Sequence, residues 1–164
     1  MASASPSTTP LLFSEIQRFS KWWLLLALEP LVIIIPVFFV KNVPWSTFLW
    51  VVPLTFLAPA LLQAATLRTE YHEDGIYVKY LPFLWKWKRF GWEDISKAYI
   101  KTYDALGDYG GWGIKKMDKH TGWCYNTRGN IGLQLVFNDD SKILIGTQHP
   151  NEVSKAIATY LTSD

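Results

Sequence analysis

Two long apolar stretches near the N-terminus constrain this chain more than any other feature. Residues 22–40 contain one ionisable side chain, Glu29, and residues 45–65 contain none. A bilayer core of about 30 Å needs roughly 20 helical residues, and both stretches reach that length. The sequence therefore predicts a transmembrane helical hairpin over residues 22–65.

The connection between these stretches is so short that it joins only antiparallel neighbours. Arg18 and Lys21 precede the first stretch and Arg68 follows the second, whereas the connection holds only Lys41. Positive charge marks the cytoplasmic side of a membrane. We therefore predict a two-pass membrane protein with both termini in the cytoplasm.

Tryptophans and one carboxylate are the residues of interest in this hairpin. Trp22, Trp23 and Trp45 lie at its ends, where amphipathic rings prefer the headgroup layer, so we predict that they are interfacial anchors. A carboxylate within a span is costly and marks a function by default. Glu29 either snorkels to the interface or is protonated, which needs no function, or it makes an intramembrane polar contact with a partner helix; this contact is the functional role predicted for it.

The first 21 residues form a separate N-terminal segment. Its beginning, MASASPSTTP, is too poor in large apolar residues to fold alone. Residues 11–21 then place Leu12, Phe13, Ile16 and Phe19 at a helical period, which predicts a short amphipathic helix on the membrane surface.

Residues 66–164 have the pattern of a β domain. This segment contains thirteen Lys and Arg residues and twelve Asp and Glu residues, and so small a net positive charge does not indicate a nucleic-acid partner. Short alternating segments separated by turn residues are typical of a small antiparallel barrel or sandwich. The strands are expected at 66–72, 76–81, 84–90, 95–103, 112–117, 122–127, 131–137 and 142–145. From Pro150 onward the apolar period changes to that of one amphipathic helix, which we expect to cap the barrel.

Four short motifs carry a resemblance to a known family. Asp74-Gly75-Ile76-Tyr77-Val78 and Phe90-Gly91-Trp92-Glu93-Asp94-Ile95 resemble the hairpin and strand entry of bacterial pleckstrin-homology (PH)-like membrane proteins. Tyr109-Gly110-Gly111-Trp112-Gly113-Ile114 and Ile145-Gly146-Thr147-Gln148 are similar to a branch of unknown function. The resemblance implies a membrane-anchored α+β fold, in which the hairpin precedes a PH-like domain at 66–164. It also implies a location in the bacterial inner (cytoplasmic) membrane, and it implies no reaction.

A basic and aromatic segment is the candidate binding site of this domain. Five of the nine tryptophans lie in residues 66–164, more than a small barrel core needs. In a strand, Trp85 and Trp87 face one side and Lys86 and Lys88 the other. Such a surface favours docking on anionic lipid or on a partner protein; the alternative is a solvated strand face over a tryptophan core. The predicted docking residues are Lys79, Trp85, Lys86, Trp87, Lys88 and Arg89.

Other chemistry is weakly represented. Cys124 is expected to be a small buried hydrophobe, and His72, His120 and His149 lack the spacing of a metal site. A phosphate-binding loop of the P-loop type ends in Gly-Lys followed by Ser or Thr, and residues 107–113 lack this ending. Their glycines are therefore expected to allow tight turns. We therefore predict no catalytic residue, no cofactor, no metal and no enzymatic activity.

Two functions are compatible with these features. The favoured one is a non-catalytic accessory or scaffolding subunit of a larger membrane complex, for example an energy-converting respiratory or photosynthetic one. Membrane lipids and other integral membrane subunits would be its partners. The alternative is a small transport or signalling component that uses Glu29 for proton or ion movement.

Overall fold

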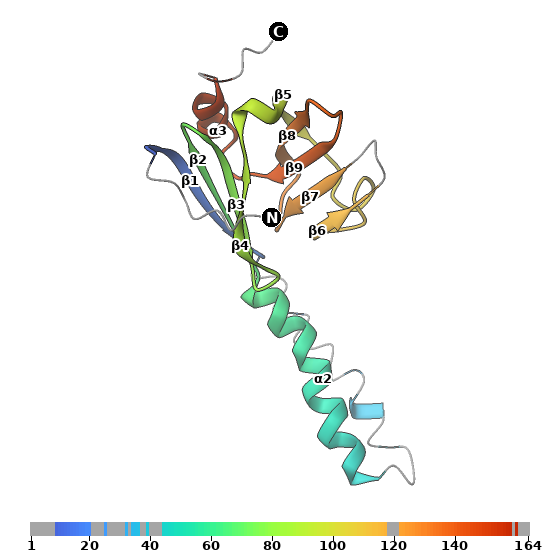
Figure 1. Cartoon of the computed structure of the whole chain (residues 1–164). Helices are drawn as coiled ribbons and strands as arrows, with labels where there is room; N and C mark the ends of the chain where they lie inside the picture. The colour runs from blue at the N-terminus through green and yellow to red at the C-terminus, as the bar shows by residue number, and fades with distance from the viewer. Residues whose placement is uncertain are drawn as a thin grey trace.

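The computed structural model describes residues 9–20, 25, 32, 34–36, 39, 44–117, 122–158 and 160, apart from the side chains of Ala58 and Leu62. In this part of the chain, nine strands form two sheets, helix α2 projects from one end, and helix α3 lies at the other (Figure 1). The single turn of 3-10 helix η2 (Trp92–Asp94) links the two sheets.

The first sheet has four strands in the order β1-β2-β3-β4, all antiparallel. Its strands are β1 (Leu11–Arg18), β2 (Thr66–His72), β3 (Gly75–Leu81) and β4 (Leu84–Phe90). The Asp74-Gly75 turn between β2 and β3 is tight because Gly75 has a φ of 145° and a Cβ there would meet the Phe90 carbonyl.

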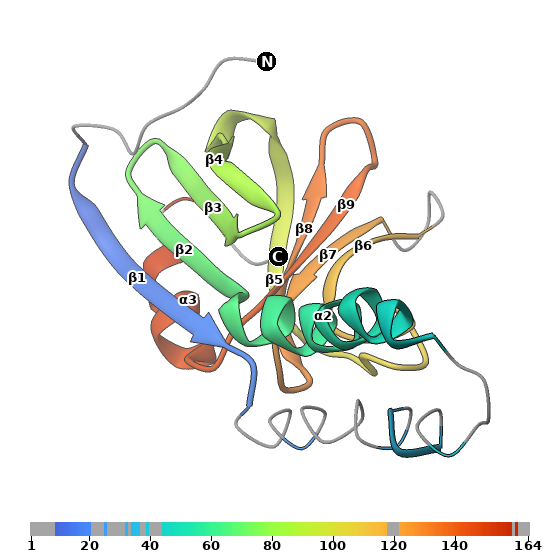
Figure 2. The same ribbon diagram turned by 90° about the horizontal axis from the view of Figure 1, so that it is seen from below.

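The second sheet has five strands in the order β5-β8-β9-β7-β6 (Figure 2). Its strands are β5 (Ile95–Thr102), β6 (Gly113–Lys116), β7 (Trp123–Asn126), β8 (Ile131–Phe137) and β9 (Lys142–Gly146). Strands β7 and β9 are parallel, whereas the other pairs are antiparallel. The expectation of a purely antiparallel barrel is therefore wrong at this pair.

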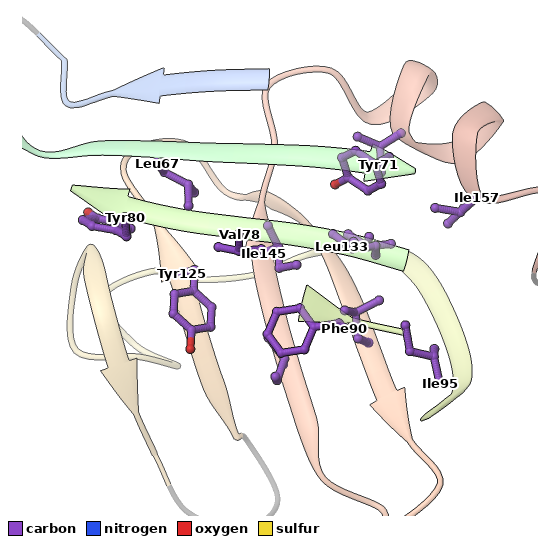
Figure 3. Close-up of a cluster of buried hydrophobic side chains, with 14 of the residues drawn as sticks. Leu67, Tyr71, Val78, Tyr80, Phe90, Ile95, Tyr125, Leu133, Ile145 and Ile157 are labelled. Atoms are coloured by element: carbon purple, nitrogen blue, oxygen red, sulfur yellow. The ribbon is translucent and has the colours of Figure 1, made fainter. Parts of the chain in front are cut away.

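The core lies between the two sheets (Figure 3). Each strand points alternate residues inward, so Leu67 and Val78 of the first sheet meet Leu133 and Ile145 of the second, and all four are fully buried. Helix α3 (Pro150–Ile157) adds Val153 and Ile157 to this core. The strand expected at 131–137 and the helix expected from Pro150 are confirmed.

Strand β1 replaces the amphipathic interfacial helix that the sequence predicted over residues 11–21. It pairs with β2 over its whole length, and its side chains alternate between the core and the surface. Two of the apolar residues that suggested a helix, Leu12 and Ile16, are exposed. Glu15 and Gln17 point inward instead.

Hydrogen bonds to the second sheet explain why these polar side chains are buried. The Glu15 carboxylate accepts the Thr147 hydroxyl and the Gln148 backbone N–H, both at 2.7 Å. The Gln17 side-chain amide donates to the Gly146 carbonyl at 2.6 Å. Because polar residues fill the inward positions, the apolar pattern of this segment does not show the period of a strand.

Helix α2 (Trp45–Ala64) covers the second apolar stretch and is continuous through Pro53 and Pro59. None of the helices in the described part of the chain combines the length and the apolarity that a bilayer crossing requires. The predicted fold class with its transmembrane hairpin, and the two-pass location in a bacterial inner membrane, are therefore wrong. Counting uncharged residues overlooked the prolines and the Ser, Thr and Gln side chains of α2, which lower its hydropathy.

The helical region is an insertion between two neighbouring strands of the first sheet, β1 and β2. Arg18, the last residue of β1, is paired with Thr66, the first residue of β2. The chain therefore leaves the sheet and returns to it at one place, with α2 in between (Figure 1). Strand β1 thus belongs to the same sheet as the strands that follow α2.

Candidate functional site

The hairpin of β3 and β4 carries all six residues predicted for docking. The register of β3 against β4 shifts between Val78 and Tyr80, so Lys79 lies at a bulge. On the side of the bulge away from the turn, Val78 is paired with Lys88. On the outer face, the Lys79 ammonium group lies 5.7 Å from the centre of the Trp87 ring. Lys88 points to the face opposite to that of Trp87, so the predicted alternation along β4 is confirmed for Trp87 and Lys88.

Lys88 lies inside a group of aromatic rings between the two sheets. Its Nζ atom is 5.2 Å from the centre of the Phe90 ring, 5.6 Å from Trp123 and 5.8 Å from Tyr125. It also donates a hydrogen bond to the Tyr125 hydroxyl at 3.2 Å. Burial lowers the pKa of Lys88. Lys88 therefore connects the two sheets through these contacts, and its ammonium group is not directed to the surface where a partner would bind.

Arg89 is also engaged within the hairpin region. Its guanidinium donates to the Glu93 carboxylate at 3.1 Å and to the Asp74 carbonyl at 2.6 Å, and lies 3.4 Å from the Asp74 carboxylate. Burial opposes the charged form, but Glu93 and Asp74 outweigh it, so the pKa of Arg89 is raised. This ion-pair network fixes the end of β4.

Three residues at the other end of the hairpin remain exposed. Phe83 lies in the β3–β4 turn, and Trp85 and Lys86 follow it in β4. The Trp85 side chain is 73% exposed. Large aromatic side chains so open to solvent are typical of binding surfaces when they lie beside further apolar area.

That further area is supplied by α2. Leu81, at the end of β3, is paired with Thr66, two residues after the end of α2. The β3–β4 turn therefore lies at the same end of the sheets as the base of the helix (Figure 1). Along α2, Trp50 is 79% exposed and Leu54 68% exposed. The exposed apolar side chains of the helix are Trp45, Leu49, Trp50, Leu54, Phe56, Leu57 and Leu61.

We refer to these helix residues together with Phe83, Trp85 and Lys86 as the docking surface. No charged residue occurs in α2, so Lys86 and Lys79 provide the positive charge next to it. A helix that is apolar on all sides is normally covered by other protein or by lipid.

Of the predicted membrane residues, Trp45 alone is within the part of the chain that the structure describes. Trp45 begins α2, with its ring 5.6 Å from that of Phe48. Glu29, Trp22 and Trp23 lie outside the described residues.

The tryptophans of the β part are mostly used within the fold. The Trp92 indole N–H donates to the His72 carbonyl at 2.9 Å, and its ring stacks on Tyr160. The Trp112 indole N–H donates to the Gly129 carbonyl, and Trp123 stacks on Tyr125. The excess of tryptophan over core needs, which pointed to docking, therefore reduces to Trp85 and Trp87 of β4.

Cys124 is buried in β7 as predicted, and burial raises the pKa of its thiol to about 12. His72 is also buried, with its ring nitrogens near the Thr9 carbonyl and the Glu70 carboxylate. Within the described residues, no group of three or more His, Cys, Asp or Glu side chains is arranged for a metal ion. Gly110, Gly111 and Gly113 all have positive φ angles, in agreement with the turns expected there.

The chain has no match among protein-family models, curated proteins or solved structures. The resemblance of its motifs to PH-like proteins thus stays a prediction.

Proposed function

We propose that this protein is a non-catalytic accessory subunit that docks onto a partner protein through the docking surface. The observation that carries the proposal is the exposure of α2, a long helix without a charged residue, on which Leu49, Trp50, Leu54 and Leu57 are each at least half exposed. Burial of each such side chain in an interface contributes about 1.5–3 kcal/mol, so this much exposed apolar surface favours association strongly.

The chemistry of the surface indicates the kind of partner. An uncharged helix packs best against apolar helices, because any polar group opposite it would lose its hydrogen bonds to water. Lys86 and Lys79 at the base of the helix favour acidic residues next to those helices. We therefore propose a partner subunit that offers an apolar helix flanked by Asp or Glu.

Crosslinking in the native host tests this proposal. A photo-reactive benzoyl-phenylalanine replaces Leu54 in one variant and Trp85 in another. Leu106, an exposed apolar residue in the loop after β5, serves as the matched control position. We expect the first two positions to crosslink to the same protein, at an apolar helix flanked by acidic residues, and the control position to miss it.

A charge reversal at Lys86 and the identity of the crosslinked molecule decide whether the proposal holds. Adding Lys86→Glu to the Leu54 variant should reduce the yield of the crosslink about tenfold, because it reverses one charge at the interface. Products formed only with lipid, only with a second copy of the chain, or equally from Leu106 would contradict the proposal.

A further inference from the structure

The outer face of the five-stranded sheet has a strongly one-sided charge. Its five strands contain no Asp or Glu, and four of their lysines, Lys97, Lys101, Lys115 and Lys142, lie on this face. Because Ile100 and Ile143 point into the core, their neighbours Lys101 and Lys142 point outward. Among the described residues, none of these four lysines takes part in an ion pair.

A cavity of about 390 Å³ opens on this outer face. Tyr99 of β5 and Gln134 of β8 are paired across the strands and both line it. The loop after β5 adds Asp108 and Tyr109. This volume is within the usual range for pockets that hold small organic molecules.

Lys101 and Lys142 enter the cavity from different strands. Their partners on β8 are Gly132 and Val136, four residues apart, which is about 13 Å along the strand. Both lysines line the cavity. Two ammonium groups without a carboxylate partner suit a phosphate group, for which lysine is a common ligand.

The other lining groups suit the remainder of a nucleotide. Tyr99 is about half exposed at 47%, and aromatic rings open to solvent are the usual stacking partners of bases. Gln134 is 3% exposed, and its amide nitrogen already donates to the Leu135 and Ile143 carbonyls. Its oxygen and the Asp108 carboxylate are acceptors for ribose hydroxyl groups, as acidic residues are in other nucleotide sites.

Tyr109 adds a buried phenol to the wall of the cavity. Its side chain is 1% exposed and contacts Tyr103 edge-on at 5.7 Å between ring centres. Burial raises the pKa of Tyr109, with Cys124 and Asp108 adding to the effect, so its hydroxyl remains protonated. A protonated hydroxyl is a hydrogen-bond donor that a phosphate oxygen accepts.

We propose that this cavity binds a mononucleotide, with its phosphate at Lys101 and Lys142 and its base on Tyr99. The inference is independent of the docking surface, which lies on α2 and the β3–β4 hairpin.

Calorimetric titration of the whole chain with AMP, adenosine and inorganic phosphate tests the proposal. We expect AMP to bind with a dissociation constant of about 1 mM or lower, and each fragment to bind at least about tenfold more weakly. Lys101→Ala with Lys142→Ala should weaken AMP binding at least about tenfold, because charged hydrogen bonds are lost. Tyr99→Leu should weaken AMP and adenosine but leave phosphate unchanged.

The matched control removes two positive charges elsewhere. Arg128 and Lys155 are exposed and lie outside the cavity, so Arg128→Ala with Lys155→Ala should change AMP binding less than about twofold. Thermal unfolding of each variant checks that the fold is intact. Failure of AMP to bind at about 10 mM, phosphate binding as tight as AMP binding, or an equal loss in the control would overturn the proposal.

Discussion

At the scale of single residues, the buried carboxylate of Glu15 is expected to contribute strongly to stability. It accepts two hydrogen bonds from the segment after β9, and it is buried. Glu15→Ala leaves the Thr147 hydroxyl and the Gln148 N–H without an acceptor, which we expect to lower the free energy of unfolding by about 2–4 kcal/mol. Urea unfolding measures the change.

Its neighbour on the same strand provides the control. Ser14 is exposed, so Ser14→Ala should change the free energy of unfolding by less than about 0.5 kcal/mol. Glu15→Gln keeps one acceptor and should fall between the two. Equal losses for Glu15→Ala and Ser14→Ala would show that the buried hydrogen bonds contribute nothing.

Lys86 and Lys88 have similar sequence surroundings but different environments. Lys88 is partly buried against three rings, whereas Lys86 is exposed. We expect Lys88→Ala to destabilise the protein by about 1–2 kcal/mol through lost packing and cation–π contacts. Lys86→Ala should change stability by less than about 0.5 kcal/mol. Thermal unfolding compares the two, and the opposite ranking would contradict this arrangement.

The buried thiol and phenols predict sensitivity to alkaline pH. Burial raises the pKa of Cys124 from 9.0 to about 12, and that of Tyr125 from 10.0 to about 12. A pKa that is higher in the folded state means that stability is fully present below the unfolded value and is lost as pH rises through the folded value. We therefore expect the free energy of unfolding to fall between pH 9 and 12.

Cys124→Ala tests the contribution of the thiol to this loss. The variant has one buried acid fewer, so its stability should decline less steeply with pH in the same range. Denaturant titrations at several pH values give the slope. An identical slope in both proteins would mean that Cys124 does not titrate on unfolding.

At the scale of elements, the sequence predicted what local periodicity controls. Strand β8 alternates cleanly, and Pro150 begins the C-terminal helix, so both were found. Strand β1 was missed because the partners of Glu15 and Gln17 lie more than a hundred residues away. The parallel pairing of β7 with β9 depends on tertiary contacts in the same way.

The candidate site was predictable only in part, for the same reason. The sequence identified Trp85 and Lys86, which are exposed. It also selected Lys88 and Arg89, whose partners are on other elements. The cavity beside Lys101 and Lys142 was missed, because its residues come from three strands and a loop whose adjacency appears only in the fold.

At the same scale, α2 should be separable from the sheets. Replacing residues 20–64 by Asn-Gly joins β1 to β2 with a tight turn, since Arg18 and Thr66 are already paired. Phe19 and Ala65 remain, because both are buried in the core. We expect cooperative thermal unfolding and a circular dichroism spectrum of β type. Loss of cooperative unfolding would show that α2 is needed for the fold.

At the scale of the whole molecule, the pairing of Glu15 with Thr147 has a consequence for biosynthesis. The two residues are 132 positions apart, so β1 leaves the ribosome long before the Thr147 hydroxyl that donates to Glu15 exists. Contacts of such high sequence separation form late and slow folding. Strand β1 can pair with β2 early, but the buried carboxylate of Glu15 is satisfied only after the C-terminal part of the chain has been made and has folded against it.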